Sequence, residues 1–149
     1  MKIKSKKGIS ITKIYPFESK IKHELPLYTA RISAGFPSPA DDYLDKKLDL
    51  NEYLIKHPAS TFFVRVDGDS MIDAGIHSGD ILIVDRALEP TGNSIVIAVI
   101  DGDLTVKRIK KTNDKLFLLA ENPNYPLIEI KPDMSFEVWG VVSYVIHKV

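Results

Sequence analysis

From residue 61 to the end of the chain, short apolar runs alternate with clusters of turn residues. The runs are rich in valine, isoleucine, leucine and phenylalanine, a composition typical of β-strands. This pattern predicts seven strands, over Thr61–Val66, Asp80–Asp85, Ser94–Ile100, Leu104–Ile109, Leu116–Ala120, Leu127–Ile130 and Phe136–Ile146. The Asp101-Gly102 pair between two of these runs is a strong hairpin signal. With almost no helix between the runs, the pattern favours a mainly antiparallel sheet.

One helix is predicted, over Asp49–His57. Asp49 is a suitable N-cap, Glu52 follows three residues later in the position of a capping box, and Pro58 ends the segment. Between the N-terminal part of the chain and this helix, residues 34–42 contain two prolines, a glycine and small residues. This composition favours extended backbone, so we expect an exposed linker.

The N-terminal residues are strongly basic. Residues 1–22 contain seven lysines and one acid, Glu18, although the whole chain has 20 basic and 20 acidic residues. Pro16 and Pro26 interrupt helical periodicity, and the nearby isoleucines form no extended amphipathic face, so no helix-turn-helix is predicted. We therefore expect a solvated N-terminal arm, with contact to phosphate or to an acidic partner as the alternative, and no sequence-specific binding of DNA.

Composition excludes several classes of protein. The chain of 149 residues has the size of one ordinary domain, and its lack of cysteine excludes disulfide scaffolds and thiolate chemistry. No uncharged stretch approaches the roughly 18 residues that span a bilayer, and the lysine-rich N-terminus lacks the apolar run of a secretory signal. These features predict a cytoplasmic protein without a membrane contact.

Metal and cofactor sites have little support in the sequence. The four histidines show neither the spacing of metal ligands nor the order of a catalytic triad. Asp67, Asp69 and Asp73 are spaced roughly as in a calcium loop, but Met71 stands where an oxygen ligand is required. The chain also lacks a phosphate-binding glycine loop. We therefore expect no metal and no cofactor.

Ser70 is the candidate nucleophile, because it follows a predicted strand in a Gly-Asp-Ser-Met loop. A serine hydroxyl needs a base, and with histidine unsupported a neutral lysine on an apolar strand face is the next candidate. Lys107 meets this demand, since strand alternation places it on one face with Thr105 and Ile109. Taken alone, Ser70 also fits an ordinary turn serine, and Lys107 belongs to a basic run that fits a solvated sheet edge.

Three segments together resemble a known family. Val66-Asp67-Gly68-Asp69-Ser70-Met71, Gly79–Asp85 and Asp103–Arg108 are similar to the serine–lysine self-cleaving proteins of the bacterial DNA-damage response, a family that includes LexA, phage repressors and UmuD. The resemblance runs from about residue 34 to the C-terminus. Within the family, the UmuD branch is the most similar, through Gly35–Ala40, the helix start Asp49-Leu50-Asn51 and the helix end His57-Pro58. That branch often has cysteine where Ala34 stands here.

The resemblance implies a fold and a site. The fold would be the mainly β, antiparallel fold of LexA and signal peptidase, with one short helix and a flexible N-terminal arm. Ser70 would be the nucleophile and its backbone N–H an oxyanion donor, Lys107 would be the general base, and Ala34-Gly35 would be the bond cut. The chain would then divide into an arm, residues 1–34, that is removed, and a peptidase-like β domain, residues 35–149.

The resemblance also implies partners. It predicts a homodimer that is cut when a RecA filament on single-stranded DNA stimulates it. The product would be an accessory subunit of a UmuC-like Y-family lesion-bypass polymerase. Two other functions remain open from the residues: a dimeric regulator without enzymatic activity, and a phage-type repressor body that lacks its DNA-binding domain.

Overall fold

The computed structural model describes residues 9–18, 24–28 and 44–149. The chain divides into two compact units, which are described separately. The larger contains residues 1–17 and 57–149, and the smaller contains residues 18–56. The linker predicted over residues 34–42 lies outside the described residues.

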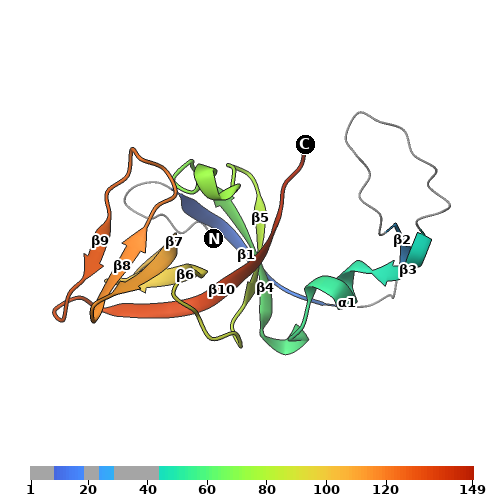
Figure 1. Cartoon of the computed structure of the whole chain (residues 1–149), viewed down its shortest axis with the longest axis horizontal. Helices are drawn as coiled ribbons and strands as arrows, with labels where there is room; N and C mark the ends of the chain where they lie inside the picture. The colour runs from blue at the N-terminus through green and yellow to red at the C-terminus, as the bar shows by residue number, and fades with distance from the viewer. Residues whose placement is uncertain (1–8, 19–23, 29–43) are drawn as a thin grey trace. The chain divides into compact units, whose positions relative to one another are not determined.

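The larger unit is built on an antiparallel sheet of eight strands, in the order β1-β4-β5-β10-β6-β7-β8-β9 (Figure 1). Its strands are β1 (Ser10–Pro16), β4 (Thr61–Asp67), β5 (Ile81–Asp85), β6 (Ile95–Ile100), β7 (Asp103–Thr112), β8 (Lys115–Leu119), β9 (Ile128–Ile130) and β10 (Phe136–Ile146). All seven strands predicted from the apolar runs are present, most with ends shifted by one residue, and β7 continues three residues further than predicted. The predicted fold class, mainly antiparallel β, is confirmed.

Tight turns join the central hairpins as the sequence predicts. Asp101 and Gly102, between β6 and β7, have φ angles of 48° and 87°. Asn113 and Asp114, between β7 and β8, have φ angles of 45° and 64°. Two successive positive φ angles are typical of the type I′ turn, whose twist matches that of the flanking strands. The turns therefore fix the register in which β7 pairs with its neighbours.

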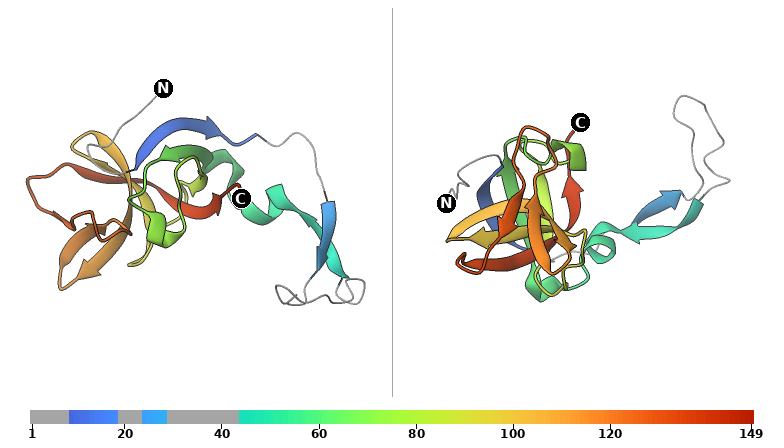
Figure 2. Two further views of the ribbon diagram at one scale, coloured as in Figure 1. Left: turned by 90° about the horizontal axis from the view of Figure 1, so that it is seen from above. Right: turned by 60° about the vertical axis from the view of Figure 1, so that its left-hand side comes forward.

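β10 gives the sheet its strong curl (Figures 1 and 2). The first half of this strand pairs with β6 and the second half with β5, with register shifts at Val138/Gly140 and Val142/Tyr144. Such irregularities bend and twist a strand. Gly140 lies between the two halves, where a Cβ atom would stand 2.5 Å from a methyl carbon of Val84. The absence of a side chain there allows β10 to approach β5 closely.

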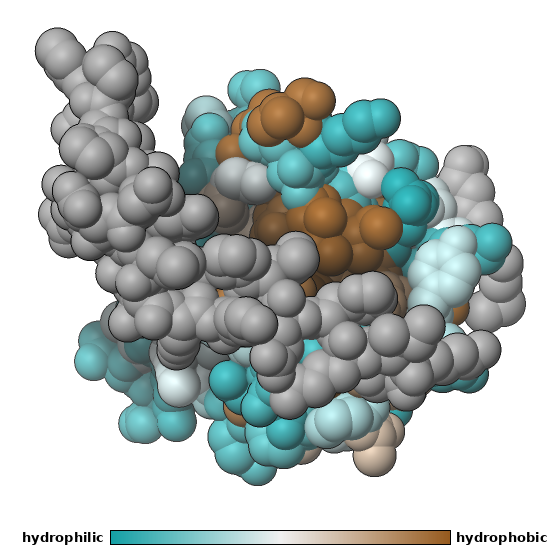
Figure 3. Space-filling model, turned by 90° about the vertical axis from the view of Figure 1, so that its right-hand side faces the viewer, coloured by the Kyte–Doolittle hydropathy of each residue, from teal (hydrophilic) through white to brown (hydrophobic). Residues whose placement is uncertain are grey.

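Two apolar clusters form the core of this unit. The first comprises Ile9, Ile11, Val64, Val66, Met71, Ile76, Leu82, Val84, Ile97 and Val106. The second comprises Val96, Ala98, Ile109, Leu118 and Val141. Alternate residues of β6 and β7 belong to different clusters, because successive side chains of a strand point to opposite faces. In Figure 3, an apolar area is visible on one face, with hydrophilic residues along part of its border.

The sequence predicts a solvated N-terminal arm, but residues 10–16 form strand β1 of the sheet. Residues 10–16 pair antiparallel with β4, and Ile9 and Ile11 are buried in the first cluster. The two isoleucines are spaced at the strand period of two, which a search for helical periodicity does not detect. Burial of such side chains, worth roughly 1.5–3 kcal/mol each, offsets the entropy of ordering a lysine-rich segment.

The smaller unit contains a two-stranded sheet, β2 (Glu24–Tyr28) with β3 (Leu44–Asp49), followed by α1 (Leu50–Leu54). The Asp49 carboxylate caps α1 by accepting from the N–H groups of Asn51 and Glu52, at 2.9 and 3.3 Å, as the sequence predicts. The helix is shorter than predicted. It ends at Leu54 because Ile55 already has extended backbone angles, and Pro58 begins a separate 3₁₀ turn, η2 (Pro58–Ser60).

Candidate active site

Ser70 lies in a tight loop between β4 and a 3₁₀ turn, η3 (Ile72–Ala74). Gly68 has a φ of 108°, a conformation that glycine adopts without strain, and it turns the chain out of β4. One residue after Ser70, Met71 is fully buried in the first core cluster. The buried Met71 side chain therefore anchors the loop to the core, and the loop is not a freely exposed surface turn.

The Ser70 side chain is itself buried. Its residue has no exposed surface, and its Oγ accepts a hydrogen bond from the backbone N–H of Ile9 at 3.0 Å. Ile9 immediately precedes β1, so the same segment that adds a strand to the sheet also covers the hydroxyl. In this structure the candidate nucleophile is thus closed off from solvent by its own N-terminal segment.

The loop after β8 fastens the Ser70 loop from a second side. The Asn122 side-chain amide donates to the Asp69 carbonyl at 2.9 Å, and the Tyr125 hydroxyl donates to the Asp69 carboxylate at 2.6 Å. The hydrogen bond to Asp69 is the main cause that raises the pKa of Tyr125 above its usual value. The N–H of Asp73 donates to the Glu121 carbonyl at 2.8 Å. These contacts hold the residues on both sides of Ser70 in place.

Lys107 lies in the middle of β7 and is buried. Only 4% of its surface is exposed, which excludes the solvated sheet edge that its basic neighbours suggested. It pairs across the sheet with Val96, a buried apolar residue, so its face of the strand is dry. Burial lowers the pKa of the Lys107 ammonium below its usual value, because low-polarity surroundings disfavour the charged form. This shift is the property that a lysine base requires.

Tyr125 lies between the Ser70 loop and Lys107. The Lys107 Nζ lies 6.0 Å from the centroid of the Tyr125 ring, and the hydroxyl of the same ring bonds to Asp69, the neighbour of Ser70. Among the described residues, no hydrogen bond joins Ser70 directly to Lys107, since the serine oxygen accepts from Ile9 instead. Thr105, on the same face as Lys107, has a buried hydroxyl without a hydrogen-bond partner in the described part of the chain. Lys107 therefore has a polar neighbour within a mostly apolar environment.

The predicted oxyanion donor, the backbone N–H of Ser70, makes no backbone hydrogen bond within the described residues. Within the described loop, the N–H groups of Ile72, Ala74 and Gly75 donate to backbone carbonyls, whereas that of Ser70 donates to none. An N–H without a backbone acceptor is available to a ligand. The other two predicted residues, Ala34 and Gly35, lie outside the residues that the structure describes.

Asn122 and Tyr125 are supporting residues that the sequence analysis did not identify. They contact Asp69 across 53 and 56 residues of chain, a separation that no local pattern reveals. The turn residues Asn122-Pro123-Asn124 mark a loop there, but not its contact with the Ser70 loop.

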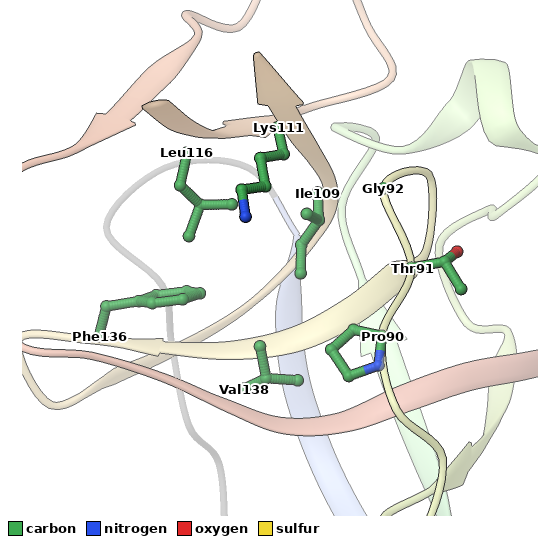
Figure 4. A pocket seen from close by; sticks show the side chains of 8 residues that line it. All are labelled: Pro90, Thr91, Gly92, Ile109, Lys111, Leu116, Phe136 and Val138. Carbon is green, nitrogen blue, oxygen red and sulfur yellow. The ribbon is translucent and has the colours of Figure 1, made fainter. Parts of the chain in front are cut away.

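A pocket of about 270 Å³ lies elsewhere on the larger unit (Figure 4). Its walls come from the loop at Pro90 and from the edge of the second core cluster, including Ile109, Leu116 and Phe136, with the Lys111 side chain at its border. Neither Ser70 nor Lys107 lines it. The candidate chemistry therefore lies in the buried serine loop and not in this pocket.

Residues 26–143 match the model of the Peptidase S24-like family, which is most of the chain. The chain belongs to the Peptidase S24-like family. It is 47% identical over 135 residues to Protein SamA of Salmonella typhimurium, which covers 91% of this chain and 94% of SamA. It is 47% identical over 123 residues to Protein MucA of Escherichia coli, covering 82% and 84% of the two chains.

A more distant S24 relative is the LexA repressor of Stenotrophomonas maltophilia, 36% identical over 141 residues, which are 91% of this chain and 66% of the repressor. The chain is thus a serine autopeptidase of the S24 family and a self-cleaving SOS mutagenesis protein of the UmuD type. None of its described helices is long and apolar enough to cross a membrane.

Proposed function

We propose that Ser70 and Lys107 form the catalytic dyad of this S24 peptidase and cut the chain between Ala34 and Gly35. The neutral amine of Lys107 takes the Ser70 proton as Oγ attacks the carbonyl carbon of Ala34. The tetrahedral intermediate then collapses, and Lys107 returns the proton to the departing amine of Gly35. Water hydrolyses the resulting ester between Ser70 and Ala34, which releases residues 1–34 and 35–149.

The observation that carries this proposal is that the Ser70 hydroxyl and the Lys107 amine are both buried. An exposed lysine is almost entirely protonated at pH 7 and cannot accept a proton. Lys107 is buried opposite Val96, and its pKa is lowered for that reason. The Tyr125 bridge between Asp69 and Lys107 keeps the serine loop close to this amine.

The Ser70 backbone N–H is the proposed oxyanion donor. It makes no backbone hydrogen bond within the described residues, and a preorganised N–H of this kind stabilises the negative oxygen of a tetrahedral intermediate.

The support for cleavage between Ala34 and Gly35 is the chemistry of these two residues. Alanine and glycine place the smallest side chains on either side of the carbonyl, and glycine allows the backbone to bend into a narrow cleft.

The contact between Ile9 and Ser70 gives the uncut protein a resting state. The hydroxyl cannot both accept from Ile9 and lie open to a peptide carbonyl, so Ile9 must withdraw before attack. An activator then acts by shifting this equilibrium toward the open state. In the proposal this activator is the RecA filament on single-stranded DNA, and the protein is located in the cytoplasm, where that signal arises.

The processed protein, residues 35–149, is proposed to act as a homodimer that binds a UmuC-like Y-family polymerase. Support comes from its 47% identity with SamA and MucA, together with the UmuD-like segments of the sequence. The chain's equal numbers of basic and acidic residues argue against direct binding to duplex DNA by the body of the protein.

Cleavage of the purified full-length chain by activated RecA filament, followed by intact mass, tests the proposal. Wild type should give the two fragments 1–34 and 35–149, whereas Ser70→Ala and Lys107→Ala should stay whole. Ser135→Ala, which alters an exposed serine outside the site, is the matched control and should be cut like wild type. A fragment beginning at Gly35 from Ser70→Ala would overturn the assignment of the nucleophile.

A further inference from the structure

A second cluster of chemically active side chains lies at the start of β5. It consists of His77, Asp80 and His147, whose potential ligand atoms lie within 4.8 Å of one another. The His147 Nδ1 is 2.6 Å from Asp80 Oδ1, and the His77 Nδ1 is 3.7 Å from Asp80 Oδ2. The two imidazole rings face each other at a tilt of 35°, with centroids 4.4 Å apart.

Sheet topology explains why the spacing of histidines in the sequence does not reveal this cluster. β10 pairs antiparallel with β5 through Ile146 and Ile81 (Figure 1). The next residues along this register are His147 and Asp80, which are 67 positions apart in the chain. His77 joins them through a tight turn, in which its backbone N–H donates to the Asp80 carboxylate at 2.8 Å. The expectation that no metal binds rested on sequence spacing alone.

One atom of the cluster lacks a hydrogen-bond partner. The Nδ1 of His77 is buried and makes no hydrogen bond with any described residue, because 3.7 Å from Asp80 is too long for one. Buried polar atoms are nearly always satisfied, so an unpaired nitrogen of this kind points to a ligand-binding position. Asp80, only 3% exposed, supplies the negative charge beside it.

We propose that His77, Asp80 and His147 bind a divalent transition-metal ion of the zinc class. Two imidazole nitrogens and one carboxylate oxygen form a donor set that suits Zn²⁺, whereas Mg²⁺ and Ca²⁺ prefer oxygen ligands alone. Each imidazole binds in its neutral form. Both histidine side chains are about two-fifths exposed, which gives the ion a path from solvent and leaves a coordination position for water.

The bound ion would tie the end of β10 to the turn that precedes β5. The same turn is bonded to the end of β4. The Gly79 N–H donates to the Val66 carbonyl at 2.7 Å, and the Val66 N–H donates to the Asp80 carbonyl at 3.1 Å. Binding to the folded state alone stabilises it by mass action. Zinc should therefore raise the unfolding temperature of the chain.

Isothermal titration of the untagged, EDTA-treated, full-length Ser70→Ala chain with ZnCl₂ tests the proposal, with MgCl₂ as the comparison ion. We expect one zinc per chain, no response to magnesium, and an unfolding temperature raised by several degrees. His77→Ala and His147→Ala should each weaken zinc binding at least tenfold. His57→Ala is the matched control, because His57 forms a similar pair with Asp85, at 2.6 Å, and its substitution should leave zinc affinity unchanged.

Cobalt absorption spectroscopy provides a second test, which uses the wild-type chain. Co²⁺ in the wild-type site should give the visible absorption of a four-coordinate ion, and zinc should displace it. The proposal is overturned if zinc binds no tighter than about 1 mM, if His77→Ala and His147→Ala bind it as wild type does, or if His57→Ala loses as much affinity. Circular dichroism identifies any variant that does not fold, and His→Gln at the same position then replaces it.

Discussion

The backbone N–H of Ile9 donates a hydrogen bond to the hydroxyl oxygen of Ser70 across 61 residues of chain. Both residues are fully buried, so the segment that begins β1 also closes the proposed active site. This single contact links the strand pairing of the N-terminal segment to the availability of the nucleophile. It predicts that spontaneous cleavage is limited by how often Ile9 withdraws.

Replacing Ile9 by proline tests this link, because proline lacks the N–H that Ser70 accepts. Proline also removes the buried isoleucine side chain, so Ile9→Ala, which loses the side chain but keeps the N–H, serves as the control. Relative to this control, loss of one hydrogen bond, worth about 0.5–1.5 kcal/mol, should raise the rate of cleavage without RecA by roughly 2- to 10-fold. Rates are read from gel densitometry of the uncut chain at pH 8. Equal rates in the two variants would show that this contact does not restrain the serine.

Tyr125→Phe tests the contact between the loop after β8 and the Ser70 loop. The change removes the hydroxyl that bonds to Asp69 but keeps the ring near Lys107. We expect cleavage to slow by about 10-fold, because the serine loop is less well positioned, while the pH midpoint of the rate stays unchanged. Tyr144→Phe, on β10, should cleave like wild type. A shifted midpoint would instead mean that the hydroxyl influences the protonation of Lys107.

Burial of the Lys107 amino group should cost stability at neutral pH. Since its pKa in the folded state is lowered, the folded protein binds fewer protons than the unfolded chain between that pKa and the usual lysine value. The stability that depends on neutral Lys107 is therefore fully present above the pKa of lysine in the unfolded chain. It is lost as the pH falls through the lowered pKa of Lys107 in the folded protein. Unfolding temperatures of Ser70→Ala with and without Lys107→Met measure the effect.

The Lys107→Met chain should be more stable at pH 7, by a few degrees, since about 1 kcal/mol corresponds to roughly 2–8 °C in a domain of this size. At pH 10.5 the difference should shrink. A methionine variant that is less stable at pH 7 and equally so at pH 10.5 would indicate that packing, and not desolvated charge, governs this position.

Gly140→Ala tests the close approach of β10 to β5. The added methyl group would meet Val84 at 2.5 Å and Arg86 at 3.3 Å, so one strand must shift. Overpacking of this kind costs about 1–3 kcal/mol in the free energy of unfolding, measured by urea denaturation. Gly92→Ala is the control, because nothing lies within 4 Å of its added carbon. Equal midpoints for the two variants would contradict the steric role of Gly140.

Much of the sheet follows from local sequence, but strand β1 and the burial of Lys107 do not. The strand runs, the Asp101-Gly102 turn and the Asp49 cap each depend on neighbouring residues, which is why the pattern predicts them. β1 escaped prediction because its alternation is short: a register shift between Ile11 and Lys13 breaks the period before Ile14. Strand alternation also placed Lys107 on a face with Ile109, but its low exposure depends on how closely the folded chain packs over that face.

The site shows the same division. Ser70 and Lys107 can be proposed from the order of their segments and from the family resemblance. The contacts of Ser70 with Ile9, and of Asp69 with Tyr125, join residues more than 50 positions apart and follow only from the folded sheet. No property of the single strands carries this information.

The most direct test of the account is the rate of cleavage without RecA between pH 7 and pH 10, with fragment masses determined at each pH. If the neutral amine of Lys107 activates Ser70, the rate should rise with pH, by at most about 10-fold per pH unit, and level off below the usual pKa of lysine, with Gly35 at the start of the product. Lys107→Ala should lower the rate by about 100-fold or more and abolish the rise, whereas Lys110→Ala, an exposed neighbour, should keep both. A wild-type rate independent of pH, or an unchanged profile in Lys107→Ala, would contradict the proposed dyad.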